Sequence, residues 1–501
     1  MNLGIGSWPA RRAKLRPDDI AIVFEGRQWS YREVDRRVTR LANALMEAGV
    51  SKGDRVAYVG FNHPALLESF FATGLIGAVC VLVNPRLKPA EVDYILADAG
   101  AAVVAYGAEQ AATAEQLAPE QPARTWLSVD GGGPGTLFED FLTAGAEDPV
   151  EVEVDEQDLA LIMYTSGTTG RPKGAMLTHR NLFYQYVNAL IGQDIRQDEV
   201  HLAVAPLFHI AGLNMLTVPT FTLGGQIIIH RAFRAPDVLA EIADSKVTSS
   251  FMVPAMLDSL THQPGFDEID LTSLRSLAAG GAPVPERMIR TWQERGVEIM
   301  QGFGMTETAP GVCMLEPRDG IVKAGSVGRA MFFTENQVVD LNGNPVAAGV
   351  PGEVIIQGPN VMSGYWKKPE ESAKALAGGW YHSGDIAVVD EDGYMWIKDR
   401  IKDMYISGGE NVYPAEIENA LLNVPGVREA AVIGVPDEKW GESGRAFVVL
   451  DPGAEVTGEQ VRAQLKDRLA GYKLPREVVV VEQLPRTTTG KLQKQLLRAQ
   501  S

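Results

Sequence analysis

A loop rich in glycine, serine and threonine has the residue types that hold phosphate groups. Residues 164–174 read Tyr-Thr-Ser-Gly-Thr-Thr-Gly-Arg-Pro-Lys-Gly and follow an apolar segment at 159–163. Glycines let backbone N–H groups turn inward, hydroxyls add donors, and Lys173 adds positive charge, so the loop suits a polyphosphate. The spacing around Lys173 fits neither G-x4-G-K-[ST] nor GxGxxG, which excludes a Walker A loop and a dinucleotide fingerprint.

Five further short motifs follow this loop along the chain. They are Gly280-Gly281-Ala282-Pro283, Gln301-Gly302-Phe303-Gly304-Met305-Thr306-Glu307, Ser383-Gly384-Asp385, Asp399-Arg400-Ile401-Lys402-Asp403 and Pro485-Arg486-Thr487-Thr488-Thr489-Gly490-Lys491. Glycines allow a ligand to approach the backbone, Phe303 offers an aromatic face, and Glu307 offers the carboxylate oxygen that Mg²⁺ prefers. Taken alone, each motif has an ordinary explanation as a turn, a packed ring or a solvated helix end.

The six motifs stand in the order typical of the adenylate-forming superfamily, which the chain resembles over nearly its whole length. That superfamily includes acyl-CoA synthetases, peptide-synthetase adenylation domains and firefly-type luciferases. The resemblance implies an α/β fold with a large N-terminal lobe of layered α/β subdomains and a small, mobile α+β C-terminal lobe. It also implies ATP, Mg²⁺ and, as co-substrate, CoA.

The resemblance gives each motif a role in joining a carboxylate to the α-phosphate of ATP. The residues expected to hold the β- and γ-phosphates are Thr165, Ser166, Gly167, Thr168, Thr169 and Lys173. The residues expected around the nucleotide are Gly281, Ala282, Pro283, Gly302, Phe303, Gly304 and Met305. Thr306 is expected at the α-phosphate, Glu307 and Thr165 at the Mg²⁺, and Asp385 and Arg400 at the ribose. Lys491 is expected to reach the carboxylate and α-phosphate oxygens during adenylation.

The same resemblance predicts a rotating C-terminal lobe. Residues 1–399 are expected to form the adenylation domain, 400–403 the hinge with Lys402 at its centre, and 404–501 the lid domain. Rotation lets one cleft serve two reactions, because a different face of the lobe covers it each time. In the second reaction Ser407, Gly408, Gly409 and Asn411 are expected to line the channel for the thiol arm of CoA.

The acyl site is predicted from Phe208-His209. Amino-acid-activating relatives have Phe-Asp here, with the Asp binding the ammonium of the substrate, so His209 disfavours an amino acid and resembles the aromatic gate of acyl-CoA synthetases. Gly304 stands where acetate-specific relatives have Trp, which favours a larger acid. The expected walls are apolar: Ile210, Ala211, Met252, Val253, Gly281, Val284, Met305 and Pro310.

The elements that must position these residues follow an alternating pattern. A strand is expected at 20–24, followed by a segment at 28–31. Ser30 and Glu33 form a capping box, so a helix is expected to begin there and to end near Gly49. Strands and helices then alternate, which favours parallel α/β layers. Residues 108–158 are rich in Ala, Gly, Pro and acids and are interpreted as a surface excursion. Shorter units begin near residue 400, where the net charge changes from −17 to −1.

Composition excludes several classes. A net charge of −18 argues against nucleic-acid binding, and the distant Cys80 and Cys313 exclude a disulfide framework or zinc knuckle and favour a reducing compartment. No secretory signal is visible, and the longest apolar run, 70–83, is too short to cross a bilayer. We therefore expect a cytoplasmic protein without a transmembrane segment. Peripheral membrane contact and a homodimer stay open at this point.

The predicted activity is that of an ATP-dependent acyl-CoA synthetase: an acid–thiol ligase that makes acyl-CoA, AMP and pyrophosphate by way of an acyl-adenylate. The segments 309–312 and 358–362 resemble two bacterial groups, the medium- to long-chain fatty-acyl-CoA ligases and the feruloyl/4-coumaroyl-CoA ligases. The sequence alone does not choose between these acids. The alternatives are transfer to a carrier protein, a luciferase-like oxygenation and a non-catalytic nucleotide-binding relative.

Overall fold

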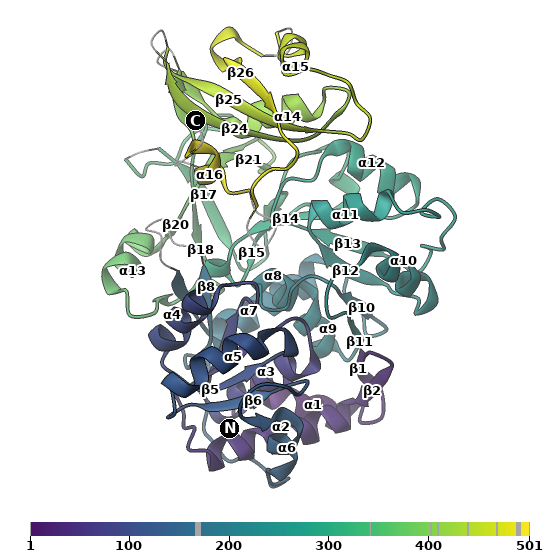
Figure 1. Ribbon diagram of the computed structural model, residues 1–501, viewed down its shortest axis with the longest axis vertical. Coiled ribbons are helices and arrows are strands. Elements are labelled where there is room, and N and C mark those ends of the chain that lie inside the picture. Colours follow the sequence, from purple (N-terminus) through teal and green to yellow (C-terminus); the bar gives the residue numbers. More distant parts are fainter. Residues whose placement is uncertain are drawn as a thin grey trace. The chain divides into compact units, whose positions relative to one another are not determined.

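The chain divides into two compact units in the computed structural model. The residues described are 2–165, 172–340, 342–400, 403–407, 410–437, 440–466, 469–486 and 492–499. The first unit comprises Met1–Ala324, Gly328–Glu335 and Ile356–Tyr381, and the second comprises Gly325–Val327, Asn336–Ile355 and His382–Ser501. The first unit has the layered helices and sheets of the predicted α/β class, and the second is smaller (Figure 1).

A nine-stranded sheet forms one half of the first unit. Its strands, in spatial order, are β16 (Arg329–Ala330), β15 (Gly311–Met314), β14 (Ile299–Gly304), β13 (Ser276–Ala279), β12 (Ser249–Met252), β10 (Val200–Ala203), β11 (Gln226–Ile229), β1 (Ile20–Phe24) and β2 (Arg27–Ser30). The six strands from β14 to β1 run parallel to one another, and the edge strands pair antiparallel. Parallel strands place all their carboxyl ends at one edge of the sheet.

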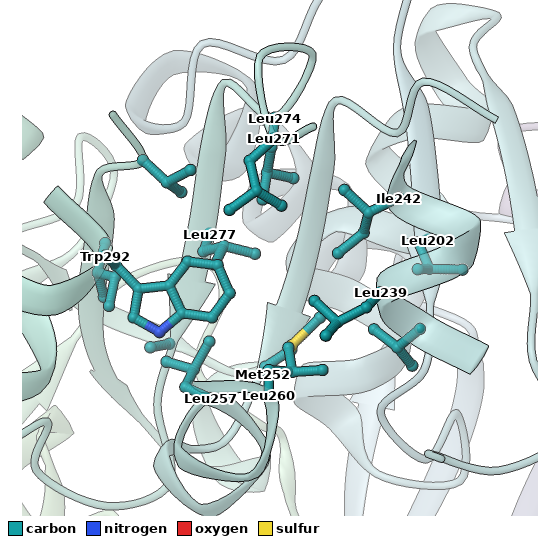
Figure 2. Packing of buried hydrophobic residues seen from close by; sticks show 14 of the residues in the cluster. Leu202, Leu239, Ile242, Met252, Leu257, Leu260, Leu271, Leu274, Leu277 and Trp292 are labelled. Carbon is teal, nitrogen blue, oxygen red and sulfur yellow. The ribbon is translucent and has the colours of Figure 1, made fainter. Parts of the chain in front are cut away.

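Three helices cover one face of this sheet. They are α10 (Ala235–Asp244), α11 (Pro254–Thr261) and α12 (Glu286–Glu294). Figure 2 shows their side chains packed against those of the strands, with Leu239, Leu257 and Trp292 from the helices against Leu202 and Met252 from the strands. Since each buried CH₂ group contributes about 0.8 kcal/mol, this cluster holds the parallel strands in register. The other face carries α7 (His179–Gly192), α8 (Ile210–Gly212) and α9 (Val218–Leu223).

An eight-stranded sheet forms the other half. Its order is β19 (Gly364–Tyr365), β9 (Lys173–Thr178), β8 (Leu159–Thr165), β4 (Val79–Val83), β3 (Arg55–Val59), β5 (Ala101–Tyr106), β6 (Thr125–Ser128) and β7 (Thr136–Leu137). The helices of this part are α1 (Trp8–Leu15), α2 (Tyr31–Glu47), α3 (Pro64–Ile76), α4 (Pro89–Ala99), α5 (Ala111–Leu117), α6 (Phe138–Ala144) and α13 (Pro369–Ala375). The parallel strands β3, β4 and β5 are rich in valine and alanine, and nearly all of their residues are buried, as expected for strands covered on both faces.

The predicted capping box is confirmed at the start of α2. The Ser30 hydroxyl accepts from the Glu33 N–H at 3.3 Å, and the Glu33 carboxylate accepts from the Ser30 N–H at 2.7 Å. These two bonds satisfy donors at the first turn that the helix itself leaves without a partner. The helix α1 that precedes β1 was not predicted.

The interpretation of 108–158 as a surface excursion is wrong. The strand β6 from this segment pairs parallel with β5, and its Trp126 and Leu127 are buried. The helix α6 adds the buried Phe138 and Leu142. The sequence hid these buried positions, because no run of apolar residues in this segment is longer than two residues.

The second unit contains two smaller sheets. The four-stranded sheet has the order β17 (Glu335–Val339), β18 (Gly352–Gln357), β20 (Tyr381–Val389) and β21 (Met395–Arg400), of which a few end residues belong to the first unit. The five-stranded sheet has the order β23 (Glu410–Val412), β22 (Tyr405–Ser407), β25 (Gly441–Leu450) and β24 (Val427–Asp437), with β26 (Glu477–Val480) beside β25. Its helices are α14 (Pro414–Leu422), α15 (Gly458–Gln464) and α16 (Lys494–Arg498).

Candidate active site

Several predicted site residues follow the carboxyl ends of neighbouring parallel strands. His209 follows β10, Gly281 follows β13, and Glu307 follows β14, and these strands belong to one parallel set with β12 between them. Ligands of open α/β sheets bind at this edge, where the loops leave the strands. The sheet therefore gathers the predicted acyl, nucleotide and metal positions at one edge.

The turn that carries Thr306 and Glu307 is held tightly from both sides. The Met305 N–H donates to the Pro310 carbonyl at 3.0 Å, and the Thr308 hydroxyl donates to the same carbonyl at 2.7 Å. Asn360 donates from its amide nitrogen to the carbonyls of Thr308 at 2.9 Å and Gly311 at 2.7 Å. These bonds fix the turn before any ligand binds, which is how a binding site is pre-organised.

Gly304 is required by this tight turn. A Cβ atom at position 304 would lie 1.7 Å from the Pro310 carbonyl oxygen, so no other residue fits without moving the backbone. A side chain at position 304 would point at the Pro310 carbonyl, so Gly304 does not by itself indicate room for a larger acid. The glycine at position 304 is explained by its close contact with the backbone of Pro310. Other residues must determine the size of the acid.

The residues expected around the nucleotide are accessible. Gly281, Ala282 and Pro283 are exposed, and Gly281 has φ +83°, a conformation that glycine adopts without strain. Phe303 is half-buried at the end of β14. The segment after Pro283 is anchored by Gln301, whose side-chain oxygen accepts from the Val284 N–H at 2.7 Å. The loop therefore presents an open backbone surface on a fixed base.

The predicted phosphate loop connects two antiparallel strands. β8 continues through Tyr164 and Thr165, beyond the predicted end at 163, and Thr165 lies opposite Lys173, the first residue of β9. The loop thus emerges from a hairpin whose two flanking residues face each other. Ser166, Gly167, Thr168 and Thr169 lie outside the described residues.

Lys173 and Glu307 both contact Tyr365. The Tyr365 hydroxyl donates to Glu307 Oε1 at 2.9 Å, and Lys173 Nζ lies 5.3 Å from the centroid of the Tyr365 ring. Lys173 also forms an ion pair with Glu371 of α13. Burial, with a smaller contribution from Glu307, raises the pKa of Tyr365, so its hydroxyl stays protonated and acts as a donor.

Glu307 fits the metal that the resemblance implies. Its side chain is buried, with 8% of the residue exposed, and its carboxylate is oriented by the Tyr365 hydroxyl. A carboxylate oxygen held by an outer hydrogen bond is a typical ligand of Mg²⁺, which takes few protein ligands and keeps several waters. Among the described residues no group of three or more His, Cys, Asp or Glu side chains forms a metal cage. The donor set therefore suits a metal that arrives with a phosphate-bearing ligand.

His209 stands at a loop-to-helix junction. It is half-buried directly before α8, its N–H donates to the Pro206 carbonyl at 3.1 Å, and its ring lies 4.6 Å from that of Phe208. The loop before it is fixed by the buried Asn62, which accepts from the Leu207 N–H at 2.7 Å and donates to the Ala205 carbonyl at 3.0 Å. Sequence reasoning missed Asn62, because a buried amide between distant segments leaves no local pattern.

Two of the expected acyl walls belong to the core. Met252 and Val284 are buried in the cluster under α11 and α12, on the face of the sheet shown in Figure 2. Side chains alternate along a strand, so the neighbouring Phe251 faces the opposite side. There it joins a cluster that contains four methionines: Met215, Met300, Met314 and Met331. Of the remaining candidates, Ala211 packs against this methionine cluster.

In the second unit, the two residues expected at the ribose pair with each other. Asp385 on β20 lies opposite Arg400 on β21, and Arg400 Nε is 3.0 Å from Asp385 Oδ1. The Asp385 N–H donates to the Ser383 hydroxyl at 3.0 Å, and Gly384 has φ +69°. Asp385 therefore belongs to a strand, where its carboxylate has a fixed direction.

The expected thiol channel is described only in part. Ser407 is buried at the end of β22, opposite Glu410 of β23, and Gly408 and Gly409 between them lie outside the described residues. So do Lys402, Lys491 and the side chain of Asn411. The helix α16 that follows Lys491 is anchored by Lys494, whose Nζ lies 2.8 Å from Glu418.

Sequence reasoning also missed Tyr365, Asn360 and Glu371. All three act across segments that are far apart in the chain, so no spacing rule finds them. The sequence of 358–371 could have indicated them: Gly364-Tyr365 stands shortly before Pro369-Glu370-Glu371, which is a typical first turn of a helix.

Within the described residues, no helix combines the length and the apolar composition needed to cross a membrane.

Comparisons with known proteins show which family the chain resembles. The AMP-binding enzyme family matches residues 9–366, and the AMP-binding enzyme C-terminal domain matches residues 416–491. A feruloyl-CoA synthase from Amycolatopsis sp is 48% identical over 98% of both chains. The long-chain-fatty-acid–CoA ligase FadD13 from Mycobacterium tuberculosis is 40% identical over 94% of this chain and 93% of its own. The crystal structure of ATP-bound MatB from Rhodopseudomonas palustris superposes with a TM-score of 0.91, at 33% identity over 100% and 99% of the two chains.

Proposed function

The chain belongs to the AMP-binding enzyme family and is an ATP-dependent, AMP-forming acyl-CoA ligase, and we propose that its acid is a hydroxycinnamate such as ferulate. The observation that carries this proposal is the 48% identity to a feruloyl-CoA synthase over 98% of both chains. A long-chain fatty acid is the second candidate, supported by the 40% identity to FadD13. The predicted family, fold class and type of reaction are confirmed by the comparisons.

The reaction uses three substrates in two steps. The carboxylate attacks the α-phosphate of ATP and releases pyrophosphate, and the thiol of CoA then attacks the acyl-adenylate and releases AMP. No side chain forms a covalent bond, because the substrates themselves carry the reacting groups. The enzyme contributes by positioning anionic groups and stabilising the charge that develops between them.

We propose the following roles for the first step. Lys173 with 165–169 holds the β- and γ-phosphates, Thr306 donates to the α-phosphate, and Lys491 approaches the reacting oxygens. Glu307, with Thr165, holds Mg²⁺, which when bound neutralises phosphate charge. The exposed backbone at 281–283 and the half-buried Phe303 support a nucleotide base at this edge of the sheet. His209 borders the acid, next to Phe208.

For the second step we propose that the C-terminal lobe rotates. The domains are 1–399 and 404–501, and 400–403 is the hinge, with Lys402 as its pivot. The antiparallel pair of β22 and β23 supports the channel role of 407–411, since its connection carries two glycines that leave room for a thiol arm. In the rotated arrangement Lys491 leaves the reacting atoms.

A substrate panel tests the acid. AMP release and thioester formation are measured with ATP, Mg²⁺ and CoA over acetate, octanoate, palmitate, ferulate and phenylalanine. We expect the highest kcat/KM with ferulate. Product from palmitate and octanoate without product from ferulate would replace the hydroxycinnamate with a fatty acid, and product from phenylalanine alone would overturn the role of His209. A parallel arm with a holo carrier protein in place of CoA tests the acceptor.

We infer a cytoplasmic location and a homodimer. The reducing compartment is supported by Cys80 and Cys313, which are both buried and are not joined in a disulfide. The homodimer is supported by exposed aromatic rings on one surface of the first unit, where Phe332 contacts Phe333 and Phe183 contacts Tyr184. Sedimentation velocity of wild type and of Phe332→Ser tests the assembly: loss of the dimer in the variant supports this surface, and a monomeric wild type overturns the inference.

A further inference from the structure

Tyr365 contacts two charged residues, Lys173 and Glu307, both of which have proposed roles in the first step. Its hydroxyl donates to Glu307 Oε1 at 2.9 Å, and its ring faces Lys173 Nζ at 5.3 Å from the centroid. Lys173 pairs instead with Glu371. Each of the two charges therefore has a partner: Glu371 for the ammonium of Lys173, and the Tyr365 hydroxyl for the carboxylate of Glu307.

The position of Tyr365 is set by its strand. β19 pairs antiparallel with β9 so that Tyr365 lies opposite Ala175. Residues two apart on a strand share a face, so the side chain of Lys173 is the diagonal neighbour of Tyr365. The Trp366 N–H donates to the Gly174 carbonyl at 2.8 Å and closes the pair next to Lys173. This register places the ring beside the lysine.

Two further bonds tie the same segment to Glu307 and to α13. The Met362 N–H donates to the backbone carbonyl of Glu307 at 2.8 Å, three residues before Tyr365. The Tyr365 N–H donates to the hydroxyl of Ser372 at 2.8 Å, and Ser372 follows Glu371 in α13. Tyr365 is thus held at its backbone, at its ring and at its hydroxyl, and it is only 9% exposed.

We propose that Tyr365 is a positioning residue that sets the orientation of the Glu307 carboxylate for a divalent metal. The inference rests on the proposed role of Glu307 as a metal ligand. The hydroxyl occupies Oε1 and fixes the carboxylate torsions, so the direction of the second oxygen is set before the metal nucleotide arrives. Outer hydrogen bonds of this kind orient metal ligands, and their loss weakens metal binding by about 10–100-fold.

Tyr365→Phe tests the proposal, because it removes the hydroxyl and keeps the ring beside Lys173. Binding of Mn²⁺ to the enzyme with ATP, and no acid, is followed by electron paramagnetic resonance. We expect about a tenfold or greater rise in the Mn²⁺ dissociation constant. The Mg²⁺ concentration for half-maximal pyrophosphate release should rise in parallel, while the KM for the acid stays unchanged. An unchanged Mn²⁺ dissociation constant would overturn the proposal.

Two variants separate this inference from others. Tyr31→Phe removes another buried hydroxyl of the same unit, one that donates at 2.6 Å to the carbonyl of Gly225, the residue directly before β11. It should lower the melting temperature by a similar amount and leave Mn²⁺ binding unchanged, so a merely structural role for Tyr365 would give the Tyr31→Phe result. Glu307→Gln tests the underlying function. If both Glu307→Gln and Tyr365→Phe bind Mn²⁺ as tightly as wild type, the proposed metal role of Glu307 fails. If Glu307→Gln binds Mn²⁺ weakly and Tyr365→Phe binds it normally, only the proposed role of Tyr365 fails.

Discussion

Asp385 and Arg400 face each other across two antiparallel strands and form an ion pair of 3.0 Å. The carboxylate is almost fully buried and the guanidinium is half exposed. Strands are more rigid than loops, so this pair gives the carboxylate a fixed direction. Such a carboxylate can accept hydrogen bonds from a diol without reorganising.

The first prediction concerns this carboxylate and the ribose. Asp385→Ala should raise the KM for ATP by about 10–100-fold, since a hydrogen bond to a charged group contributes about 1.5–3 kcal/mol. Wild type should prefer ATP to 2′-deoxy-ATP, and the variant should lose that preference. Steady-state pyrophosphate release with both nucleotides measures the effect. Glu391→Ala, an exposed acidic residue in the turn between β20 and β21, is the control and should match wild type.

The second prediction separates the two half-reactions. Lys491→Ala should slow adenylation by about 10²–10³-fold or more, the scale for loss of one electrostatic donor. Thioester formation from supplied acyl-adenylate and CoA should stay within a factor of a few, because the lysine is away from the reacting atoms in that step. Pyrophosphate release and CoA acylation are measured separately.

The control for that experiment is Lys466→Ala, which removes an exposed lysine from the same C-terminal part of the chain. It should affect neither half-reaction. Equal losses of both half-reactions in Lys491→Ala would contradict a lysine that acts only in adenylation.

The third prediction concerns the buried pair of Lys494 and Glu418. Burial opposes the charged form of Lys494, but Glu418 and Asp399 outweigh it and raise its pKa. Lys494→Met should destabilise the second unit by about 3–5 kcal/mol, because it leaves Glu418 buried without its cation. Lys494→Met with Glu418→Leu should recover most of that loss, as measured by urea unfolding. Lys473→Met breaks the more exposed pair with Glu416 and should cost much less.

The fourth prediction concerns pH. Burial lowers the pKa of His179 to about 4, against partial opposition from Asp158. Between the ordinary value near 6.5 and this lower value, the unfolded chain binds more protons than the folded one, so stability falls as the pH falls. The contribution is complete above pH 6.5 and is lost progressively down to pH 4, with about 2 kcal/mol lost at pH 5.

His179→Asn tests this sign. In wild type the Ile5 N–H donates to His179 Nδ1 at 3.2 Å. The asparagine side chain keeps an acceptor near this N–H but does not take up a proton in this pH range. The drop in unfolding free energy from pH 7 to pH 5 should be about 2 kcal/mol smaller than in wild type. An exchange of the exposed His262 for Asn should leave the pH dependence unchanged. An identical drop in His179→Asn and wild type would contradict a neutral buried ring.

The sequence predicted what is local and missed what is not. The capping box joins Ser30 and Glu33, which are three residues apart, and a short-range rule finds it. Tyr365 reaches Glu307 across 58 residues, and Asn62 reaches Leu207 across 145. Only the pairing of strands brings such residues together, and pairing is decided by the whole fold.

The wrong prediction for Met252 had the same origin. Met252 was expected at the acyl site, but it faces the core, and its neighbour Phe251 faces the other side. All four residues of the strand Ser249–Met252 are buried, so its sequence shows no alternation that tells which face each side chain takes. Similarly, Trp126 lay in a segment whose glycines and prolines suggested a loop, because a four-residue strand is too short to show a period.

The pairing of β1 with β11 determines when the first strand can complete its sheet during synthesis of the chain. Ile22, Val23 and Phe24 lie beside Ile227, Ile228 and Ile229, so the first strand must wait for a partner that is synthesised about 205 residues later. At about 5–20 residues per second, the ribosome needs roughly 10–40 s to supply it. During that interval the nascent chain carries an apolar strand with an unpaired edge, a form that chaperones bind. Translation speed between residues 24 and 229 should therefore influence the yield of folded enzyme.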